Sequence, residues 1–281
     1  MQKIVMLLVL AGLTGCGTQS EEGADPQAEV KPAALTYEGG DYKDHAAKLA
    51  HGKRLATVLV CTGCHGANLQ GTNVSADDPD YGDMNAPNIT LLLAGYSDAE
   101  LDQLIRHGKP RDGREFWFMP TEAYQFLSDA DYDALVAYLR TLKPEGKQLP
   151  PIRRGKGFNE EVAKGLFGNS QQQIQKFRSR QPVDLGQQHG WGRYLAQTTC
   201  TMCHNNELQG WAEFTPDLNV AGVFTPAELE TLLTTGKGKS KPDLGLMSKV
   251  ARDHFSHFTP RERQAVIAYV QARANRPQPA Q

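Results

Sequence analysis

The chain has 281 residues, which is long enough for two domains of ordinary size. Its composition is that of a globular protein, with 40% hydrophobic and 22% charged residues. A formal net charge of -2 excludes a broadly basic nucleic-acid-binding protein, so we expect no nucleic-acid partner.

The first residues predict export. An apolar run over residues 4–13 follows Lys3, and it is shorter than the roughly 20 residues that a bilayer span requires. It has the form of a signal-peptide core. Leu-Thr-Gly-Cys at residues 13–16 resembles the lipobox of bacterial lipoproteins, in which the signal peptide (here residues 1–15) is removed and the cysteine (here Cys16) carries lipid. A plain secretory signal with an incidental cysteine is the alternative.

A lipid on Cys16 would place the protein on the periplasmic side of a bacterial membrane. Gly17 rather than Asp follows this cysteine, and in Gram-negative lipoproteins that choice favours the outer membrane. Residues 16–43 are small, acidic and punctuated by proline. We therefore expect them to form a flexible tether between the lipid and the first domain.

Two pentapeptides, at residues 61–65 (Cys-Thr-Gly-Cys-His) and 200–204 (Cys-Thr-Met-Cys-His), each end a helical pattern. Two thiols three residues apart and an immediately following imidazole form the attachment pattern of c-type haem, in which the histidine becomes an iron ligand. Zinc ribbons and redox modules share only the Cys-x-x-Cys part. The sequence therefore predicts two covalent haem c groups. They are attached at Cys61, Cys64, Cys200 and Cys203 and ligated by His65 and His204.

The pentapeptides belong to an internal repeat. Aligning the halves on their cysteines sets Arg54 on Arg193. Two further helices are predicted in each half, and each starts at a Ser or Thr cap with an acidic residue three positions later. These starts are Ser97, Ser128, Thr225 and Thr259.

The repeat predicts haem domains at residues 44–142 and 186–275, with a short tail over residues 276–281. Residues 143–185 between them are rich in proline and contain a basic run at residues 153–156. We expect an irregular linker with one short helix near residues 160–167. Its basic residues would steer an acidic partner or balance haem propionates, or they would simply be solvated.

Methionine is the usual soft ligand for the second axial position of such an iron. Met119 and Met247 lie at the same distance beyond the glycine that ends the preceding helix, Gly108 in the first half and Gly236 in the second. This shared register predicts Met119 and Met247 as the distal ligands. His254 and His257 follow Met247, and either could replace it if that loop folds differently.

The residues from 106 to Pro120, with the helical segment up to Leu139, and residues 192–196 before the second motif, are similar to class I cytochromes c. The chain more closely resembles bacterial diheme proteins that join two such domains. The resemblance implies an all-α fold with crossing terminal helices, haem in an apolar crevice, and backbone carbonyls of Pro87 and Pro216 that hold the proximal histidines. One departure is Ser248 after Met247, where the family usually has proline.

These observations predict an electron-transfer lipoprotein rather than an enzyme, with redox proteins as partners and a membrane contact through Cys16. A diheme peroxidase-like enzyme is one alternative, although paired methionine ligands argue against the open site that it needs. The cytochrome subunit of a membrane-associated dehydrogenase complex is the other. The sequence leaves a free carrier and a complex subunit equally open.

Overall fold

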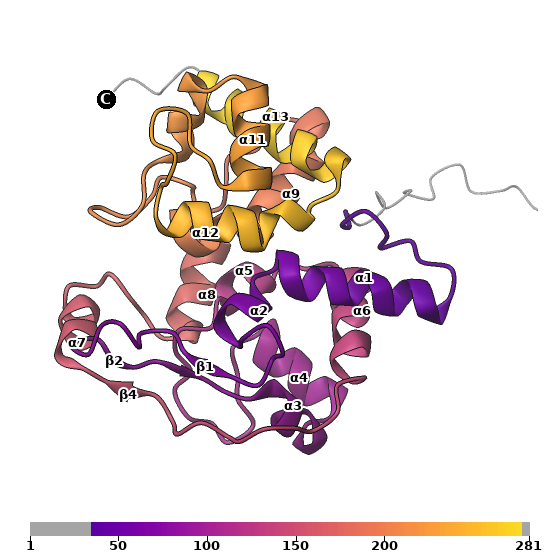
Figure 1. Ribbon diagram of the computed structural model, residues 1–281, viewed down its shortest axis with the longest axis vertical. Coiled ribbons are helices and arrows are strands. Elements are labelled where there is room, and N and C mark those ends of the chain that lie inside the picture. The colour runs from indigo at the N-terminus through magenta and orange to yellow at the C-terminus, as the bar shows by residue number, and fades with distance from the viewer. Residues whose placement is uncertain (1–34, 277–281) are drawn as a thin grey trace, which may run out of the picture. The chain divides into compact units, whose positions relative to one another are not determined.

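The computed structural model describes residues 35–276, which form helices and a few very short strands (Figure 1). Cys16, the signal peptide and most of the expected tether lie outside the described residues. No helix in the described part of the chain combines the length and the apolar character needed to cross a membrane.

The first half is built on two helices from its ends, α1 (His45–Val58) and α6 (Asp129–Leu139), which pack against each other. Asp44 caps α1 by accepting a hydrogen bond from the Ala47 N–H at 2.8 Å. Gly52 makes the close packing possible, because a Cβ there would lie 1.9 Å from the carbonyl oxygen of Ala134.

The second half repeats this pair with α9 (Gly190–Thr199) and α13 (Pro260–Asn275). Gly192 takes the part of Gly52, since a Cβ there would lie 2.1 Å from the carbonyl oxygen of Ala265. Thr259 opens α13 with a capping box, with proline at the first helical position. The expectation of an all-α fold with crossing terminal helices is confirmed.

These two glycines correct the alignment of the halves. Gly52 corresponds to Gly192, so Arg54 takes the place of Tyr194 and not of Arg193. Alignment on the cysteines was wrong here because the first half has an extra residue between the glycine and the motif. The chain absorbs it just after α1, where Val60 adopts a left-handed φ of 63°, a costly conformation for a β-branched residue.

The remaining elements pack around each helix pair, and capping boxes at Ser97 and Thr225 open α4 and α11 as the sequence predicted. Gly236 ends α11 in the left-handed conformation. The first half also contains α2 (Cys61–Cys64), β1 (Thr72–Asn73), β2 (Gly82–Asp83), β3 (Asn85–Ala86), α3 (Ile89–Leu92), η1 (Leu93–Gly95), α4 (Asp98–Ile105) and α5 (Thr121–Tyr124). The second contains η2 (Gln187–His189), α10 (Thr201–His204), η3 (Leu218–Val223), α11 (Pro226–Thr235), α12 (Leu246–Asp253) and η4 (Phe255–His257).

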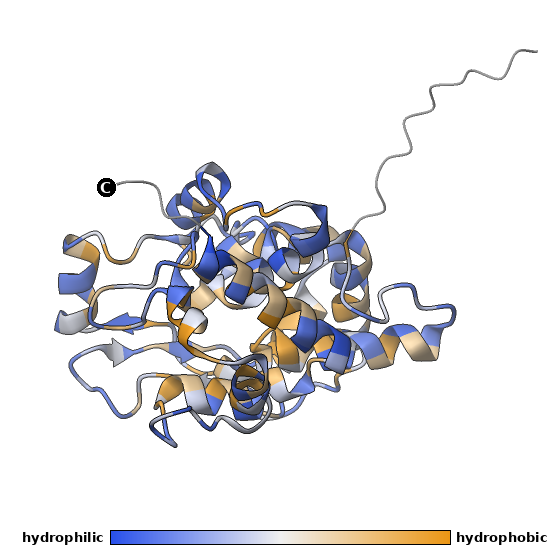
Figure 2. Cartoon of the chain, turned by 90° about the horizontal axis from the view of Figure 1, so that it is seen from above, coloured by the Kyte–Doolittle hydropathy of each residue, from blue (hydrophilic) through white to orange (hydrophobic). Residues whose placement is uncertain are grey.

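Apolar side chains of these helices form the hydrophobic core, and the core includes the residues that were expected to form stripes on α6 and α13, such as Leu135 and Val266. In Figure 2 the orange, hydrophobic stretches gather where helices pack together, and outward turns are blue. Leu135, Leu139, Val266, Tyr269 and Val270 are core residues, as expected, whereas Tyr138 is partly buried and packs against the core.

The connector is more ordered than its composition suggested. It contains β4 (Arg153–Arg154), α7 (Lys156–Ala163) and α8 (Ser170–Ser179). β4 pairs antiparallel with β2, and α8 packs against α5. Phe158 on α7 is fully buried and meets the rings of Tyr81 and Trp117 edge-on at 5.4 and 5.7 Å. Aromatic packing therefore attaches the connector to the first half.

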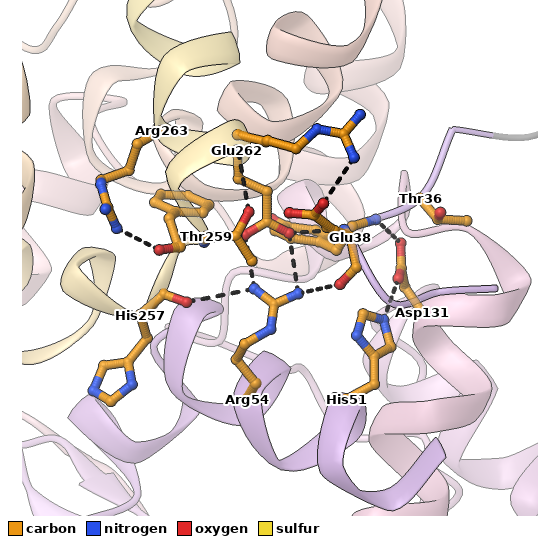
Figure 3. Close-up of polar contacts among 12 residues, drawn as sticks. Thr36, Glu38, His51, Arg54, Asp131, His257, Thr259, Glu262 and Arg263 are labelled. Atoms are coloured by element: carbon orange, nitrogen blue, oxygen red, sulfur yellow. Dashed lines mark hydrogen bonds and ion pairs between the residues drawn. The ribbon is translucent and has the colours of Figure 1, made fainter. Parts of the chain in front are cut away.

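The two halves meet through a reciprocal pair of polar contacts. Asp131 and Glu262 are each the third residue of their C-terminal helix, and both are fully buried. Arg54 of the first half binds Glu262 of the second with an Nη1–Oε2 distance of 2.7 Å (Figure 3). In return, the Tyr194 hydroxyl of the second half donates to Asp131 Oδ2 at 2.7 Å. Each N-terminal helix thus reaches the opposite C-terminal helix.

Residues 35–43, which we call the strap, complete this interface. Tyr37 is fully buried, and its N–H donates to Asp131 at 3.0 Å while its hydroxyl bonds Thr198 at 2.7 Å. The N–H of the next residue, Glu38, donates to Glu262 at 2.8 Å. The strap is therefore part of the packed structure rather than of the tether expected to run through residue 43, because its backbone donors help to satisfy both buried carboxylates.

Candidate functional site

Each attachment pentapeptide is followed by the same support for its histidine. His65 Nδ1 lies 2.8 Å from the carbonyl oxygen of Pro87, and His204 Nδ1 lies 2.8 Å from that of Pro216. The structure thus brings together the pairs that the resemblance implied. A bond at Nδ1 fixes the ring and leaves Nε2 as the nitrogen that can bind a metal.

The loop after each histidine makes two similar hydrogen bonds in the two halves, although its threonine directly follows the glycine in the first half and directly precedes the proline in the second. Its glycine N–H bonds back to the histidine carbonyl, from Gly71 to His65 at 2.7 Å and from Gly210 to His204 at 2.9 Å. A threonine hydroxyl from Thr72 or Thr215 donates to the carbonyl of the second cysteine, in each case at 2.6 Å. Two unrelated motifs would not share this backbone arrangement, so the repeat extends to the geometry of the site.

The four motif cysteines are partly buried free thiols. Burial raises the pKa of Cys61 to about 12 and the pKa values of Cys200 and Cys203 to about 11. A redox-active Cys-x-x-Cys instead lowers the pKa of its attacking thiol. Thiols with raised pKa values beside a fixed histidine fit covalent attachment of haem better than they fit thiol–disulfide exchange.

Burial also lowers the pKa of both histidines, and the bond to the proline carbonyl opposes that shift. Both imidazoles are therefore neutral at neutral pH, which is the form that donates a nitrogen lone pair to iron. Among residues 35–276, no three His, Cys, Asp or Glu side chains converge as a metal-binding group of their own.

The two methionines lie in differently built loops. Both are partly buried against the hydrophobic core. Met119 follows Phe118, whose φ of 71° is in the left-handed region, and Pro120 then caps α5. Met247 is instead inside the first turn of α12.

Ser248 has a structural duty of its own. Its hydroxyl accepts from the Leu244 N–H at 2.8 Å and donates to the carbonyl of Gly236, and the side chain is buried. The departure from proline at this position therefore replaces a rigid ring by two hydrogen bonds that hold the methionine loop against the end of α11.

The competing histidines lie at the contact between the halves. His254 Nδ1 is 3.1 Å from the carbonyl oxygen of Thr57 on α1. Its ring also covers the first attachment turn, because a Cβ on Gly63 would lie 2.8 Å from His254 Nε2. The carbonyl of His257 faces Arg54 (Figure 3). His254 is thus an interface residue that sequence reasoning placed only as a possible ligand.

Sequence reasoning also missed Arg273, a nearly fully buried arginine on α13. The position of Arg273 in the sequence is the one signal that could have identified it. Val266, Val270 and Arg273 follow one another at helical spacing, so the arginine lies on the apolar stripe of α13.

Comparisons with known proteins agree with this geometry. The family model described as Cytochrome c matches residues 49–143 and 191–274. One of the subunits of nicotinate dehydrogenase from Pseudomonas putida is 28% identical over 244 residues, covering 82% of this chain and 20% of that protein. The fructose dehydrogenase cytochrome subunit of Gluconobacter japonicus is 22% identical over 264 residues, covering 81% of this chain and 53% of that protein. The chain thus spans about half or less of these relatives.

Proposed function

The chain belongs to the cytochrome c family, and from that premise we propose that it is a diheme electron carrier on the outer side of a bacterial membrane. A c-type cytochrome transfers electrons, and covalently bound haem supplies the one-electron Fe(II)/Fe(III) chemistry. The observation that carries the diheme proposal is the repeated 2.8 Å bond from each motif histidine to a proline carbonyl.

Each residue then has a defined duty. Cys61 and Cys64 would hold the first haem, and His65 and Met119 would bind its iron. The second set consists of Cys200, Cys203, His204 and Met247. The carbonyls of Pro87 and Pro216 orient the histidines, so both imidazoles would be held in place for iron binding.

We further propose that the electron donor is a dehydrogenase. Both relatives are named as subunits of dehydrogenases, and one is named a cytochrome subunit. The described residues provide two haem-attachment motifs. The match covers 20% of the nicotinate dehydrogenase subunit and 53% of the fructose dehydrogenase cytochrome subunit. A separate subunit would then carry out substrate oxidation.

The proposed location rests on the sequence of the first residues. Cys16 after Leu-Thr-Gly would carry the lipid, and Gly17 favours the outer membrane. Cys16→Ser should move the protein from the membrane fraction to the soluble fraction of cells. A protein that stays membrane-bound after this substitution would contradict lipid anchoring.

The diheme proposal is tested by the haem content and by the oxidised spectrum. The pyridine haemochrome assay should give two haems per chain, and the weak far-red band of methionine-bound Fe(III) haem should be present. Met119→Ala and Met247→Ala should each remove about half of that band, because each removes one sulfur ligand. Full band intensity after either substitution would refute that ligand, and rapid peroxide turnover by the half-reduced protein would favour a peroxidase instead.

A further inference from the structure

The proximal loop of the second half is held by a buried charge. Arg273 has a side chain that is 1% exposed, and its Nη1 donates at 2.8 Å both to Asp217 Oδ1 and to Asn219 Oδ1. Its Nη2 donates to the carbonyl of Glu207 at 3.0 Å. Asp217 directly follows Pro216, whose carbonyl holds His204. The arginine therefore braces the segment that orients the proximal histidine.

The first half braces the matching segment without charge. Asn88 follows Pro87 as Asp217 follows Pro216, and it is fully buried. Its side-chain amide donates to the backbone carbonyl of Glu145 at 2.7 Å, and its Oδ1 accepts from Thr90 at 2.7 Å. In the second half, the Asp217 carboxylate and the Arg273 guanidinium thus take the places of the Asn88 amide and the Glu145 carbonyl.

The cause lies in the length of the C-terminal helix. α6 ends at Leu139, and the chain then turns so that the Glu145 carbonyl meets Asn88. α13 continues to Asn275, and its last turn brings Arg273 to the same place. The two anchors therefore occupy corresponding sites and differ mainly in charge.

The two charges of the second anchor do not cancel at the buried site. The Asp217 side chain is 39% exposed, so water screens it, whereas Arg273 is almost completely shielded. The Arg273 Nε also has no hydrogen-bond partner among the described residues. A net positive field is left on the proximal side of the second site.

We propose that Arg273 is a positioning residue that raises the reduction potential of the second haem site, a contribution that the first site lacks. The inference rests on the proposed diheme function. A buried positive charge disfavours the oxidised, more positive iron, so it favours uptake of the electron. The guanidinium also fixes the Pro216 carbonyl on His204 through Asp217.

The test is a spectroelectrochemical titration of the full-length holoprotein, which resolves two one-electron steps. Met247→His lowers the step of the second site and so identifies it. Arg273→Met should shift that step downward and leave the other unchanged. Arg273→Lys should keep most of the wild-type potential, because it retains the charge. Asp217→Asn, at a half-exposed position, should shift the same step upward by removing the opposing charge.

Arg180 provides the matched control, because it is an exposed arginine at the end of α8 that pairs with the Glu207 carboxylate at 3.3 Å. Arg180→Met should leave both steps in place. The proposal is overturned if Arg273→Met leaves the second step unmoved, or if both steps move together. If Arg273→Met does not take up two haems, an unchanged or downward shift in Asp217→Asn overturns it. A wild-type chain with fewer than two haems would refute the diheme function itself.

Discussion

The two halves hold the motif histidine in the same way but differ in side chains farther from it. The His–Pro bond has the same length in both. Arg54 nevertheless stands where the second half has Tyr194, and Pro120 stands where it has Ser248. In this chain the repeat keeps the bond that orients each motif histidine. It changes the side chains through which each half contacts the rest of the chain.

Breaking the reciprocal interface should have the largest effect. Arg54→Leu leaves the fully buried Glu262 carboxylate without its cation, and removal of one partner of a buried pair costs about 3–5 kcal/mol. Chemical denaturation of the holoprotein measures the free energy of unfolding. Lys53→Leu, at the exposed neighbouring position, is the control and should change it by about 0.5 kcal/mol or less. A loss below about 1 kcal/mol in Arg54→Leu would contradict the pair's role.

Substitution of the helix-crossing glycines tests whether the halves are equivalent at their cores. Gly52→Ala and Gly192→Ala should each cost about 3 kcal/mol, because the new methyl group would overlap a backbone carbonyl. Gly190→Ala serves as a control on α9, since its nearest neighbour would be 3.9 Å away. Unequal losses at Gly52 and Gly192, measured by thermal unfolding, would mean that the two crossings are not equivalent.

The sequence predicted the helix ends and the proximal contacts well because these depend on local rules. Capping boxes and the order of Cys, His and Pro act over a few residues. The interface escaped prediction because Asp131 and Glu262 look like ordinary capping residues, and their partners Tyr194 and Arg54 come from the opposite half. Burial of a polar group depends on the tertiary partner, which no local pattern reveals.

A pH dependence should distinguish the halves next. Glu122 stands three residues after Met119, where the second half has Val250 after Met247. Burial raises the pKa of Glu122 from 4.5 to about 7, and it has no salt-bridge partner within residues 35–276. The folded state therefore binds this proton more tightly than the unfolded state does. Its stability should fall as the pH rises from about 4.5 to about 7, by about 3 kcal/mol in total.

Glu122→Gln should remove that dependence and leave the protein more stable above pH 7. Glu122→Val would make the first half like the second at this position. Thermal unfolding at a series of pH values measures the effect. Glu161, a partly buried carboxylate on α7 that accepts from the Tyr81 hydroxyl, gives a control variant, Glu161→Gln, that should retain the slope. An unchanged slope in Glu122→Gln would show that another group titrates.

Ser248→Ala should have the smallest effect. It leaves the Leu244 N–H and the Gly236 carbonyl without their partner, which costs about 1 kcal/mol. The far-red band of the second site should weaken along with it, because the methionine loop loses its attachment to α11. Ser256→Ala, which removes a hydroxyl bond to Arg252 on an exposed turn, should leave the band at full intensity. Equal bands in Ser248→Ala and wild type would show that the loop does not need this clamp.

The strap determines where a force on the N-terminus acts on the packed structure. The chain enters the packed structure at the joint between the two halves, since Tyr37 and Glu38 bind the carboxylates of both C-terminal helices. With lipid on Cys16, as proposed, force from the membrane anchor would act on the contact between the halves and not on the outer end of either half. The molecule would then rotate about the contact between its two halves, and both halves would be equally accessible to a partner.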